Sequence, residues 1–455
     1  MIKVLFVNSK NPYSEVENRY HPLWPAYLAA YAEEKLGSGV VDFQFCRNNF
    51  EVHLDQYKPD IVAIGAVTQN YGYAVTYSKI AKERSIPVII GGIHITSLPE
   101  TLTEDMDVGC IGEGEETFCE LLQHFIRFEK FDIEYLDNID GIVFHKKGKL
   151  IKTPDRQPIQ SLDEMPPPKR SMIGYQYRGY VYTARGCAYN CVFCICSRYW
   201  GKIRYVKPER VIEELKEYAD NGTRVVRFAD ENFTGNVVRL KEIASLILSS
   251  GLNKRLKFSC WCRANTVTPE VVDILKSINV VSVKMGLESG SQRVLDYLKG
   301  GVKVEDNERA IRLFRKARIQ VNGDFIIGAP DETLNEIRLT YDFIRKMPLN
   351  FVDINLFSAY PGTPIWEYAL QKKLVSNDMD WELINIKLDQ TGASSIILSE
   401  KLSYSQLYNE YKRFRKLRLY KSLMSLFNSP WLNEIPGIIL KLLIGKAASF
   451  FKKNK

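Results

Sequence analysis

Histidine is scarce in this sequence, with five residues among 455. They are confined to the first third of the chain and stand at His21, His53, His94, His124 and His145. The remaining two thirds can therefore hold no metal through an imidazole ring. Long hydrophobic runs are missing as well: no stretch of about 18 uncharged apolar residues occurs, which argues against a transmembrane helix.

Cysteine is sparse but unevenly placed. Of the nine cysteines, four lie within residues 187–196, and two more are Cys260 and Cys262. Such clustering is typical of a metal site in a reducing cytoplasm and argues against a disulfide framework. The opening residues, MIKVLFVNSK, contain a strand-like apolar run in place of the layout of a secretory signal. We therefore expect a cytoplasmic protein.

The net charge of +8 does not belong to the whole chain. Residues 401–455 contain 12 Lys and Arg against 2 acidic residues, a net +10, whereas the other 400 residues carry −2. The main body therefore has no excess of the basic side chains that nucleic acids require, and we expect no nucleic-acid partner.

Residues 1–140 alternate short apolar runs with helix-like segments. The strand-like runs are KVLFVN (3–8), VDFQFC (41–46), IVAIGAV (61–67), PVIIGG (87–92) and DVGCIG (107–112). This rhythm predicts an α/β domain with a doubly wound, Rossmann-like parallel sheet. Residues 141–178 follow as a hairpin, GIVFHKKGKLIKT, and a linker in which MPPPKR disfavours both helix and central strand.

A second alternation of strands and helices occupies residues 179–365. Its six strand-like runs lie at 180–184, 223–229, 257–263, 280–286, 320–328 and 351–358. Six βα repeats predict a partial (β/α)6 barrel, in which functional side chains collect at the carboxyl ends of the strands. Polar clusters stand at those ends, namely RGC, DEN, ESGS and YPGT. Residues 366–455 are predicted to form a helical region with a basic tail.

The first of these clusters lies in RGCAYNCVFC and holds three cysteines, Cys187, Cys191 and Cys194. Iron and zinc sites made by cysteine alone usually use four thiolates. A four-iron cluster bound by three cysteines leaves one iron open to a further ligand. Two alternatives stay open, a structural zinc and a four-cysteine cluster that includes Cys196.

The pattern Cys-x3-Cys-x-aromatic-Cys after the first strand of a partial barrel resembles the radical S-adenosylmethionine (SAM) enzymes. The resemblance implies a [4Fe-4S] cluster whose open iron binds the amino and carboxylate groups of SAM. It also implies that an electron from a reducing partner, such as flavodoxin or ferredoxin, cleaves SAM to a 5′-deoxyadenosyl radical. The residues that match the SAM-binding pattern of this family are Phe193, Arg263, Glu288, Ser289 and Gly328.

The order PLWPAYLAAY, IVAIGAVTQNY, GGIHIT and GEGEETF in the first domain resembles the cobalamin-binding domain of the cobalamin-dependent radical SAM enzymes. Glycines at strand ends let a backbone approach a large flat ligand, although ligand-free turns or a vestigial domain would also use them. The chain has no Asp-x-His-x-x-Gly motif, so we expect no protein histidine on cobalt. The implied cobalamin contacts are Thr68, Gly91, Gly92, His94, Thr96, Gly112, Glu113 and Gly114.

By this resemblance, the protein forms a radical at an unactivated carbon of a small-molecule or lipid-type substrate and methylates it from methylcobalamin. Radical ring formation or oxidative rearrangement is one alternative, and a non-catalytic iron–sulfur or corrinoid sensor or carrier is another. Asp230, Glu231 and Tyr360 are candidate substrate or cofactor contacts, with helix capping as the alternative for the first two. Cys260 and Cys262 are expected to be inert core thiols.

The C-terminal segment joins charge to apolar surface. KRFRKLRLYK (412–421) has six bases, and IPGIILKLLIGKAASFFKKNK (435–455) joins an apolar run to a basic end. Such segments suit the interface of an anionic membrane, at about 1 kcal/mol for each Lys or Arg near the surface. A helix packed on the barrel is the alternative, so peripheral membrane association stays open beside a purely cytoplasmic location.

Overall fold

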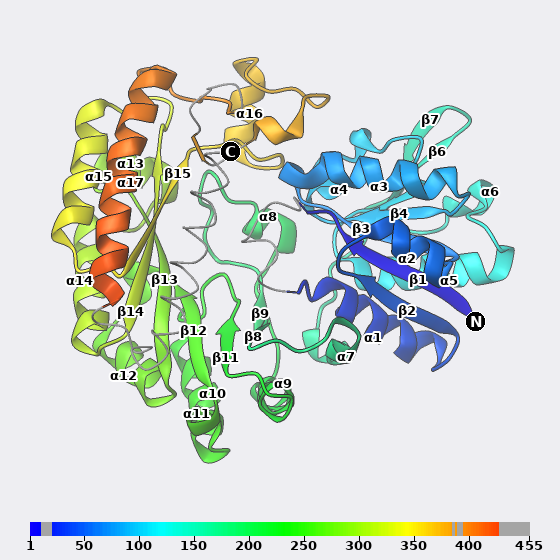
Figure 1. Cartoon of the computed structure of the whole chain (residues 1–455), viewed down its shortest axis with the longest axis horizontal. Helices are drawn as coiled ribbons and strands as arrows, with labels where there is room; N and C mark the ends of the chain where they lie inside the picture. The colour runs from blue at the N-terminus through cyan, green and yellow to red at the C-terminus, as the bar shows by residue number, and fades with distance from the viewer. Residues whose placement is uncertain (11–20, 385–386, 389–394, 427–455) are drawn as a thin grey trace, which may run out of the picture.

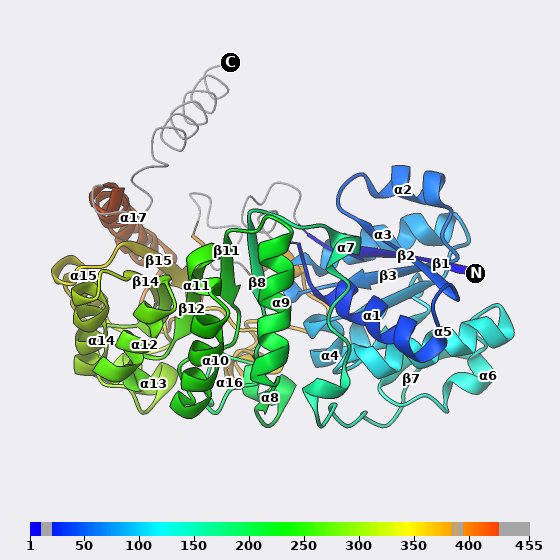
Figure 2. The ribbon, with the colours of Figure 1, turned by 90° about the horizontal axis from the view of Figure 1, so that it is seen from below.

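The computed structural model of the chain describes residues 1–10, 21–384, 387–388 and 395–426. Two α/β units lie side by side, with the N-terminal unit next to the β8 edge of the second unit's sheet (Figures 1 and 2). None of the described helices combines the length and the apolar content that a membrane span requires. The segment 435–455, predicted as a basic tail, lies outside the described residues.

The first unit is built on a seven-stranded sheet in the order β2-β1-β3-β4-β5-β6-β7. Its first five strands are parallel, as predicted, and helices cover both faces. The strands are β1 Ile2–Asn8, β2 Val41–Cys46, β3 Ile61–Gly65, β4 Val88–Gly91, β5 Val108–Cys110, β6 Ile142–Lys146 and β7 Lys149–Lys152. The helices are α1 Trp24–Leu36, α2 Phe50–Tyr57, α3 Tyr71–Glu83, α4 Ile93–Ser97, α5 Gly114–Phe128 and α6 Ile133–Leu136.

The hairpin of β6 and β7 pairs antiparallel with β5. The sheet of the first unit therefore ends at Lys152, and the hairpin, predicted as part of the 141–178 segment, belongs to that sheet. The chain then crosses to the second unit through the short helix α7 (Arg170–Ile173). Arg170 is buried there and forms ion pairs with Glu214 and Glu217, which fixes the linker on the outside of the barrel.

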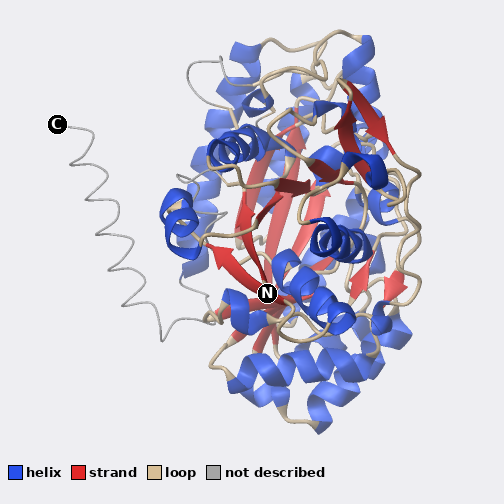
Figure 3. Ribbon diagram, turned by 90° about the vertical axis from the view of Figure 1, so that its right-hand side faces the viewer, coloured by secondary structure: helices blue, strands red, loops and turns tan. Residues whose placement is uncertain are grey.

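The second unit is a curved, six-stranded parallel sheet in the order β15-β14-β13-β12-β11-β8, which confirms the predicted partial barrel. Figure 3, viewed from the side of the first unit, shows the strands at the centre of the molecule with helices around them. The strands are β8 Arg178–Val181, β11 Val225–Phe228, β12 Lys257–Cys262, β13 Val280–Glu288, β14 Gln320–Ile327 and β15 Phe351–Leu356. The helices are α9 Pro208–Asp220, α10 Val237–Ser249, α11 Leu252–Arg255, α12 Pro269–Ser277, α13 Gln292–Lys299, α14 Val304–Lys316 and α15 Leu334–Lys346.

Burial alternates along the central strands of this sheet, because successive side chains point to opposite faces. On β13, Val283 and Met285 are fully buried against the helices, whereas Lys284 between them is only partly buried. On β12, Cys260 and Cys262 belong to the buried hydrophobic core. The two sulfur atoms lie 3.7 Å apart within the core, as expected for inert thiols, although Cys262 also reaches the cavity described below.

Short elements lie at both edges of the barrel sheet. At the β8 edge stand a two-stranded ribbon of β9 (Ala184–Arg185) and β10 (Arg204–Tyr205) and the short helix α8 (Cys196–Trp200). After β15 come α16 (Pro364–Gln371) and α17 (Tyr404–Leu426). Helix α17 packs against β15 and α15, and its buried face carries Leu407, Phe414 and Leu417.

Candidate active site

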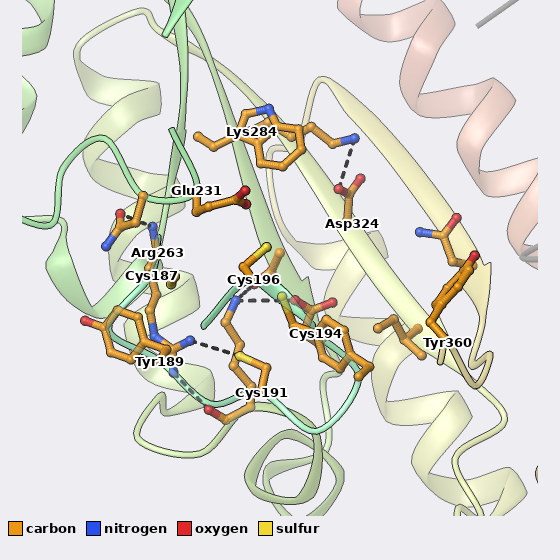
Figure 4. Close-up of a pocket in the computed structure, with 18 of the residues that line it drawn as sticks. Cys187, Tyr189, Cys191, Cys194, Cys196, Glu231, Arg263, Lys284, Asp324 and Tyr360 are labelled. Atoms are coloured by element: carbon orange, nitrogen blue, oxygen red, sulfur yellow. Dashed lines mark hydrogen bonds and ion pairs between the residues drawn. The ribbon is translucent and has the colours of Figure 1, made fainter. Parts of the chain in front are cut away.

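A cavity of about 390 Å³ opens at the carboxyl ends of the barrel strands. The loop between β9 and α8 forms one wall, the ends of β12, β13, β14 and β15 form the others, and the turn after β15 completes the rim (Figure 4). The cavity therefore lies at the mouth of the barrel, where the sequence analysis expects functional side chains.

Cys187, Cys191 and Cys194 all line this cavity (Figure 4). Gly186 precedes them with φ 101°, a conformation that favours glycine, and turns the chain from β9 into the cysteine loop. Across the described residues, no three His, Cys, Asp or Glu side chains are placed to hold one metal ion. The three thiols nevertheless share one cavity, as the ligands of a single metal cluster must.

Cys196 also lines the cavity, where it contacts Cys194 and the carboxylate of Glu231. A thiol in direct contact with Cys194 is too close to that residue to bind a different iron of the same cluster. The contact therefore favours three cysteine ligands over four. Glu231 thus lies beside the cysteine loop as a partly desolvated carboxyl group, and this burial raises its pKa.

Arg263 lies at the end of β12 and lines the same cavity. Its Nη2 donates to the backbone oxygens of Lys299 and Gly300 at 2.9 and 2.6 Å, and its Nη1 lies 3.5 Å from the Sγ of Cys191. The guanidinium also stacks 3.8 Å from the ring centroid of Tyr189. Its Nε is buried without a partner in the described structure. Arg263 thus joins the cysteine loop to the end of α13.

Glu288 and Lys299 form a nearly enclosed ion pair, 3.3 Å apart, on the cavity wall. Lys299 also donates to the backbone oxygen of Gly286. Burial raises the pKa of Glu288, and the charge of Lys299 opposes that rise. The backbone of Glu288 has φ 58°, which is uncommon for a residue with a side chain and costs of order 1–3 kcal/mol. The surrounding structure holds this carboxylate in a strained position at the site.

Three predicted site residues have other tasks in the structure. Ser289 is fully buried, and its hydroxyl lies 3.0 Å from that of Thr340 in the packing between β13 and α15. Asp230 accepts hydrogen bonds from the backbone N of Thr183 at 2.6 Å and of Ala184 at 3.2 Å, so it orders the strand-to-loop turn before the cysteines. Both side chains are buried away from the cavity lining because they satisfy backbone and side-chain groups of the fold.

Gly328, the third of these residues, has φ 90° and directly follows β14. Its N–H donates to Glu332, and a Cβ there would lie 3.1 Å from Leu356. Glycine is therefore required for the turn itself. Asp324 and Ile326 are the residues of this segment that line the cavity, and Phe193 lines it from the cysteine loop.

Tyr360 joins the cavity to the N-terminal unit. It lines the cavity, and its hydroxyl accepts a hydrogen bond from Gln69 Nε2 at 2.8 Å. Gln69 lies in the short helix that follows β3, at the carboxyl edge of the first sheet. Burial raises the pKa of Tyr360 to about 12, so the phenol stays protonated and can donate a hydrogen bond into the cavity.

Glu113 lies in the loop after β5 and binds three donors of the second unit or its linker. Its carboxylate accepts from Arg185 at 2.9 Å, from Arg204 at 2.8 Å and from the backbone N of Ile159 at 2.8 Å. Glu115 accepts from the other Nη of Arg185 at 2.5 Å. Burial alone would raise the pKa of Glu113, but the two guanidinium groups outweigh it and hold this pKa below its usual range.

We name this set of ion pairs the Glu113 clamp; it comprises Glu113, Glu115, Arg185 and Arg204. The two arginines flank the cysteine loop and α8 in sequence, and Tyr199 of α8 donates to the backbone oxygen of Gly112 at 2.9 Å. Glu113 was predicted to contact cobalamin. Its carboxylate is instead bound by protein donors, because the cysteine segment folds back onto the loop after β5.

His94 is wholly enclosed. Its ring stacks on Tyr71 at 3.8 Å and meets Trp381 edge-on at 4.6 Å, and its Nε2 lies 3.1 Å from the hydroxyl of Thr101. Burial lowers the pKa of His94 to about 3, so the ring is neutral at physiological pH. His94 was predicted as a cobalamin contact, and the structure places it in the core instead, because two aromatic residues cover the ring.

The burial of His94 gives a pH prediction. Its pKa of about 3 in the folded chain lies below the ordinary value of 6.5, so the unfolded state binds the additional proton between these values. Stability is therefore lost as the pH falls through this window, by up to about 1.4 kcal/mol per pH unit. We expect the free energy of unfolding in urea to fall less steeply between pH 6 and about pH 4 in His94→Phe than in the parent chain. An unchanged slope would contradict the burial of a neutral ring.

The remaining predicted contacts lie at the carboxyl edge of the first sheet. Gly92 has φ 111°, and a Cβ there would lie 2.4 Å from the oxygen of Ala66, so its role is backbone packing. Gly112 is open, with nothing within 4 Å of an added Cβ, and its N–H donates to Thr96 at 3.0 Å. Thr68 is buried at the start of the helix that carries Gln69.

Comparison with known proteins agrees with both halves of this architecture. Residues 181–344 match the Radical SAM superfamily, and residues 13–122 match the B12 binding domain. A protein of Pyrococcus horikoshii, named an uncharacterized methyltransferase, is 33% identical over 377 residues, which cover 79% of this chain and 80% of that protein. The chain belongs to the cobalamin-dependent radical SAM enzymes.

Two further relatives show how widely this family's architecture is shared. The anaerobic magnesium-protoporphyrin IX monomethyl ester cyclase of Cereibacter sphaeroides is 24% identical over 481 residues, covering 99% of this chain and 75% of the cyclase. The structure of the radical SAM methyltransferase TsrM from Kitasatospora setae, with cobalamin and a [4Fe-4S] cluster bound, aligns with a TM-score of 0.72. It is 20% identical with 91% of each chain covered, a likeness that shows the fold.

The residues of this cobalamin-dependent radical SAM enzyme fit the cofactors of its family. Three thiols and a buried, unpartnered guanidinium Nε suit a cluster and an anionic ligand group at the cavity. At the first sheet, Gly91, Gly112 and Gly114 leave the backbone open, since an added Cβ would meet nothing closer than 3.5 Å. Val67 is 45% exposed at the same edge, as an apolar wall for a macrocycle would be.

Proposed function

We propose that the protein is a methyltransferase that acts at an unactivated carbon of a small-molecule substrate held at the barrel mouth. The observation that carries the proposal is one cavity lined by Cys187, Cys191 and Cys194 and joined through Tyr360 and Gln69 to the corrinoid-binding edge of the first unit. Relatives named as methyltransferases support methyl transfer as the reaction, among them the Pyrococcus protein and a bacteriochlorophyllide d methyltransferase of Chlorobaculum tepidum.

The chain's own residues bind and orient the cofactors and the substrate, and they exclude water from the cavity. When bound, the cluster with SAM supplies the hydrogen-abstracting radical, and the corrinoid supplies the methyl group. Arg263 holds the cysteine loop against the end of α13 and leaves one N–H for an anionic group. Glu288 and Lys299 present a carboxylate and an ammonium group beside the cysteines. Phe193 and Phe357 provide apolar walls that keep water from the reacting carbon.

Anaerobic reconstitution tests this proposal. We expect the full chain, loaded with iron, sulfide and cobalamin, to show corrin absorption bands and to release 5′-deoxyadenosine from SAM after reduction. Supply of the methyl group from SAM through cobalamin would appear as S-adenosylhomocysteine. A chain that binds neither SAM nor cobalamin after cluster loading would refute the proposal, and binding without SAM cleavage would favour the sensor or carrier.

Radical ring formation is the second candidate, supported by the cyclase of Cereibacter sphaeroides, which matches 99% of this chain. The two reactions differ in what they consume. Methyl transfer adds one methylene to the mass of the product and uses a second SAM, whereas ring closure removes hydrogen and leaves the corrinoid unmethylated. Isotope-labelled SAM distinguishes them in any extract that contains the substrate.

For the partners, we propose a flavodoxin- or ferredoxin-type electron donor and a peripheral contact with anionic membranes through the outer face of α17. That face carries four bases, Lys412, Arg413, Arg415 and Lys416, followed by exposed Leu419, Tyr420, Leu423 and Met424. Three bases of the predicted cluster have protein partners: Lys421 donates to Met347 at 2.6 Å, Arg418 pairs with Asp353 at 3.4 Å, and Arg413 pairs with Glu410 at 2.8 Å.

Flotation with anionic vesicles tests the membrane contact. We expect the quadruple variant Lys412→Gln, Lys416→Gln, Leu419→Ser, Leu423→Ser to float less than the parent chain, because it loses two charges and two apolar anchors. These side chains are exposed, so the fold of α17 stays intact. The control replaces Lys254, Lys257, Leu248 and Leu339 in the same way on other helices and strands. Equal recovery of the parent and the α17 variant would exclude this surface.

A further inference from the structure

The interior of a closed (β/α)8 barrel is filled with branched apolar side chains. In this partial barrel, by contrast, the inner face is polar. Deeper in the cavity than the cysteine loop, Trp261, Lys284, Asp324 and Asn355 line it from four consecutive strands. Their neighbours on the same strands are buried against the helices. The lumen is therefore a binding space with side chains of both charges and not a second hydrophobic core.

Lys284 and Asp324 form an ion pair across β13 and β14, with Nζ 3.0 Å from Oδ2 (Figure 4). The two side chains keep 35% and 25% of their surface exposed to the cavity. A pair of this exposure contributes about 0–1 kcal/mol to stability, so folding does not account for it. Figure 4 shows the pair on the opposite side of the cavity from Cys191.

The nearest further charges have partners of their own: Lys387, whose charge also acts on Asp324, donates to Asn355 at 2.8 Å. Asp353, the neighbour of Asp324 across the β14–β15 register, is paired with Arg418 at 3.4 Å. The ammonium group of Lys284 lies 5.8 Å from the ring centroid of Trp261, which adds a flat apolar surface beside the charges. Desolvation raises the pKa of Asp324, and the ammonium of Lys284 opposes this rise.

The spacing of the two charges limits the ligand. Groups that complement a cation and an anion 3.0 Å apart must be carried on neighbouring atoms of one molecule. The carboxylate and ammonium of an α-amino acid meet this requirement, because one carbon separates them. A lipid chain or a tetrapyrrole ring offers no such pair. It would desolvate Lys284 and Asp324 with only their mutual attraction to offset the cost.

We propose that the barrel lumen binds the head group of a free α-amino acid as the substrate, with its carboxylate on Lys284, its ammonium on Asp324 and its side chain directed along Trp261 toward the cysteines. This inference rests on the proposed function for the reaction and adds the substrate class. The same site discriminates against lipid-type substrates.

The test uses the full chain with cluster and cobalamin, and the twenty protein amino acids as probes in equilibrium binding. We expect at least one amino acid to bind, and the amine and the carboxylic acid that each lack one of its charges to bind about 10- to 100-fold more weakly, as lost charged hydrogen bonds require. Lys284→Met and Asp324→Asn should each weaken binding to a similar degree. The matched control is Lys372→Met, which breaks an exposed ion pair with Glu400 on the surface.

SAM is the internal standard, since it also carries an amino-acid head group. Binding of SAM and formation of 5′-deoxyadenosine should be unchanged in the surface control Lys372→Met. Loss of both in the parent chain would refute the proposed function, whereas loss of amino-acid binding alone would overturn only this assignment. The double exchange Lys284→Asp, Asp324→Lys keeps an ion pair for the fold and should also lose the amino acid. Failure of all twenty probes to bind, unchanged affinity in the variants, or an equal loss of SAM would each overturn the assignment.

Discussion

Cys191→Ala abolishes 5′-deoxyadenosine formation, whereas Cys196→Ala retains the cluster and the cleavage of SAM. The expected contrast follows from geometry. Cys191 is buried, faces the cavity and lies 3.5 Å from Arg263, so no other thiol can replace it. Cys196 contacts Cys194 directly and therefore does not reach a fourth iron.

Iron content, the Mössbauer spectrum and 5′-deoxyadenosine yield after anaerobic reduction measure this contrast. Cys187→Ala and Cys194→Ala should behave like Cys191→Ala, and Cys260→Ala is the control for loss of a buried thiol that does not line the cavity. Loss of the cluster in Cys196→Ala, with no effect of added SAM on the irons of the parent chain, would establish a four-cysteine site and refute the radical SAM interpretation.

Breaking the Glu113 clamp has the second largest expected effect. The Glu113 side chain is 6% exposed and faces two arginines that are each 10% exposed. Glu113→Gln leaves Arg204 without its counter-charge and Arg185 with Glu115 alone. Removal of one partner from a buried ion pair typically costs about 3–5 kcal/mol. We expect a lower free energy of opening at the interface of the two units, together with weaker retention of the cluster.

Native-state hydrogen exchange measures this opening at the amides of 112–116 and 184–206. The matched control is Glu270→Gln, which removes an exposed pair with Lys241 at 2.6 Å and should change stability by less than about 1 kcal/mol. Equal protection of the interface amides in both variants would show that the clamp does not hold the two units together.

The sequence was sufficient for the architecture because its signals are local. Apolar runs such as IVAIGAV predicted the parallel strands of the first sheet, and six further runs predicted the partial barrel. The cysteine spacing predicted the loop that lines the cavity. Strand ends were displaced by a few residues, since the last residues of several runs belong to the turns that follow.

Side-chain tasks that depend on distant residues were not predictable. Glu113 meets Arg185 across 72 positions of sequence, and Trp381 covers His94 from after the barrel. Lys284 and Asp324 were missed although a local signal existed. Each lies two positions before a residue of the cavity wall, Gly286 or Ile326, so the period of two along a strand would have placed them on the same face.

The Glu113 clamp has a thermodynamic consequence for assembly of the holoenzyme. It fastens the loop beyond β5, in the corrinoid-binding unit, to both flanks of the cysteine segment. If binding of the corrinoid or of the cluster orders that loop, the entropic cost of binding the other group falls. By linkage, each group then raises the affinity for the other by the same factor. Loading order would then change the path to the complete enzyme without changing its final free energy.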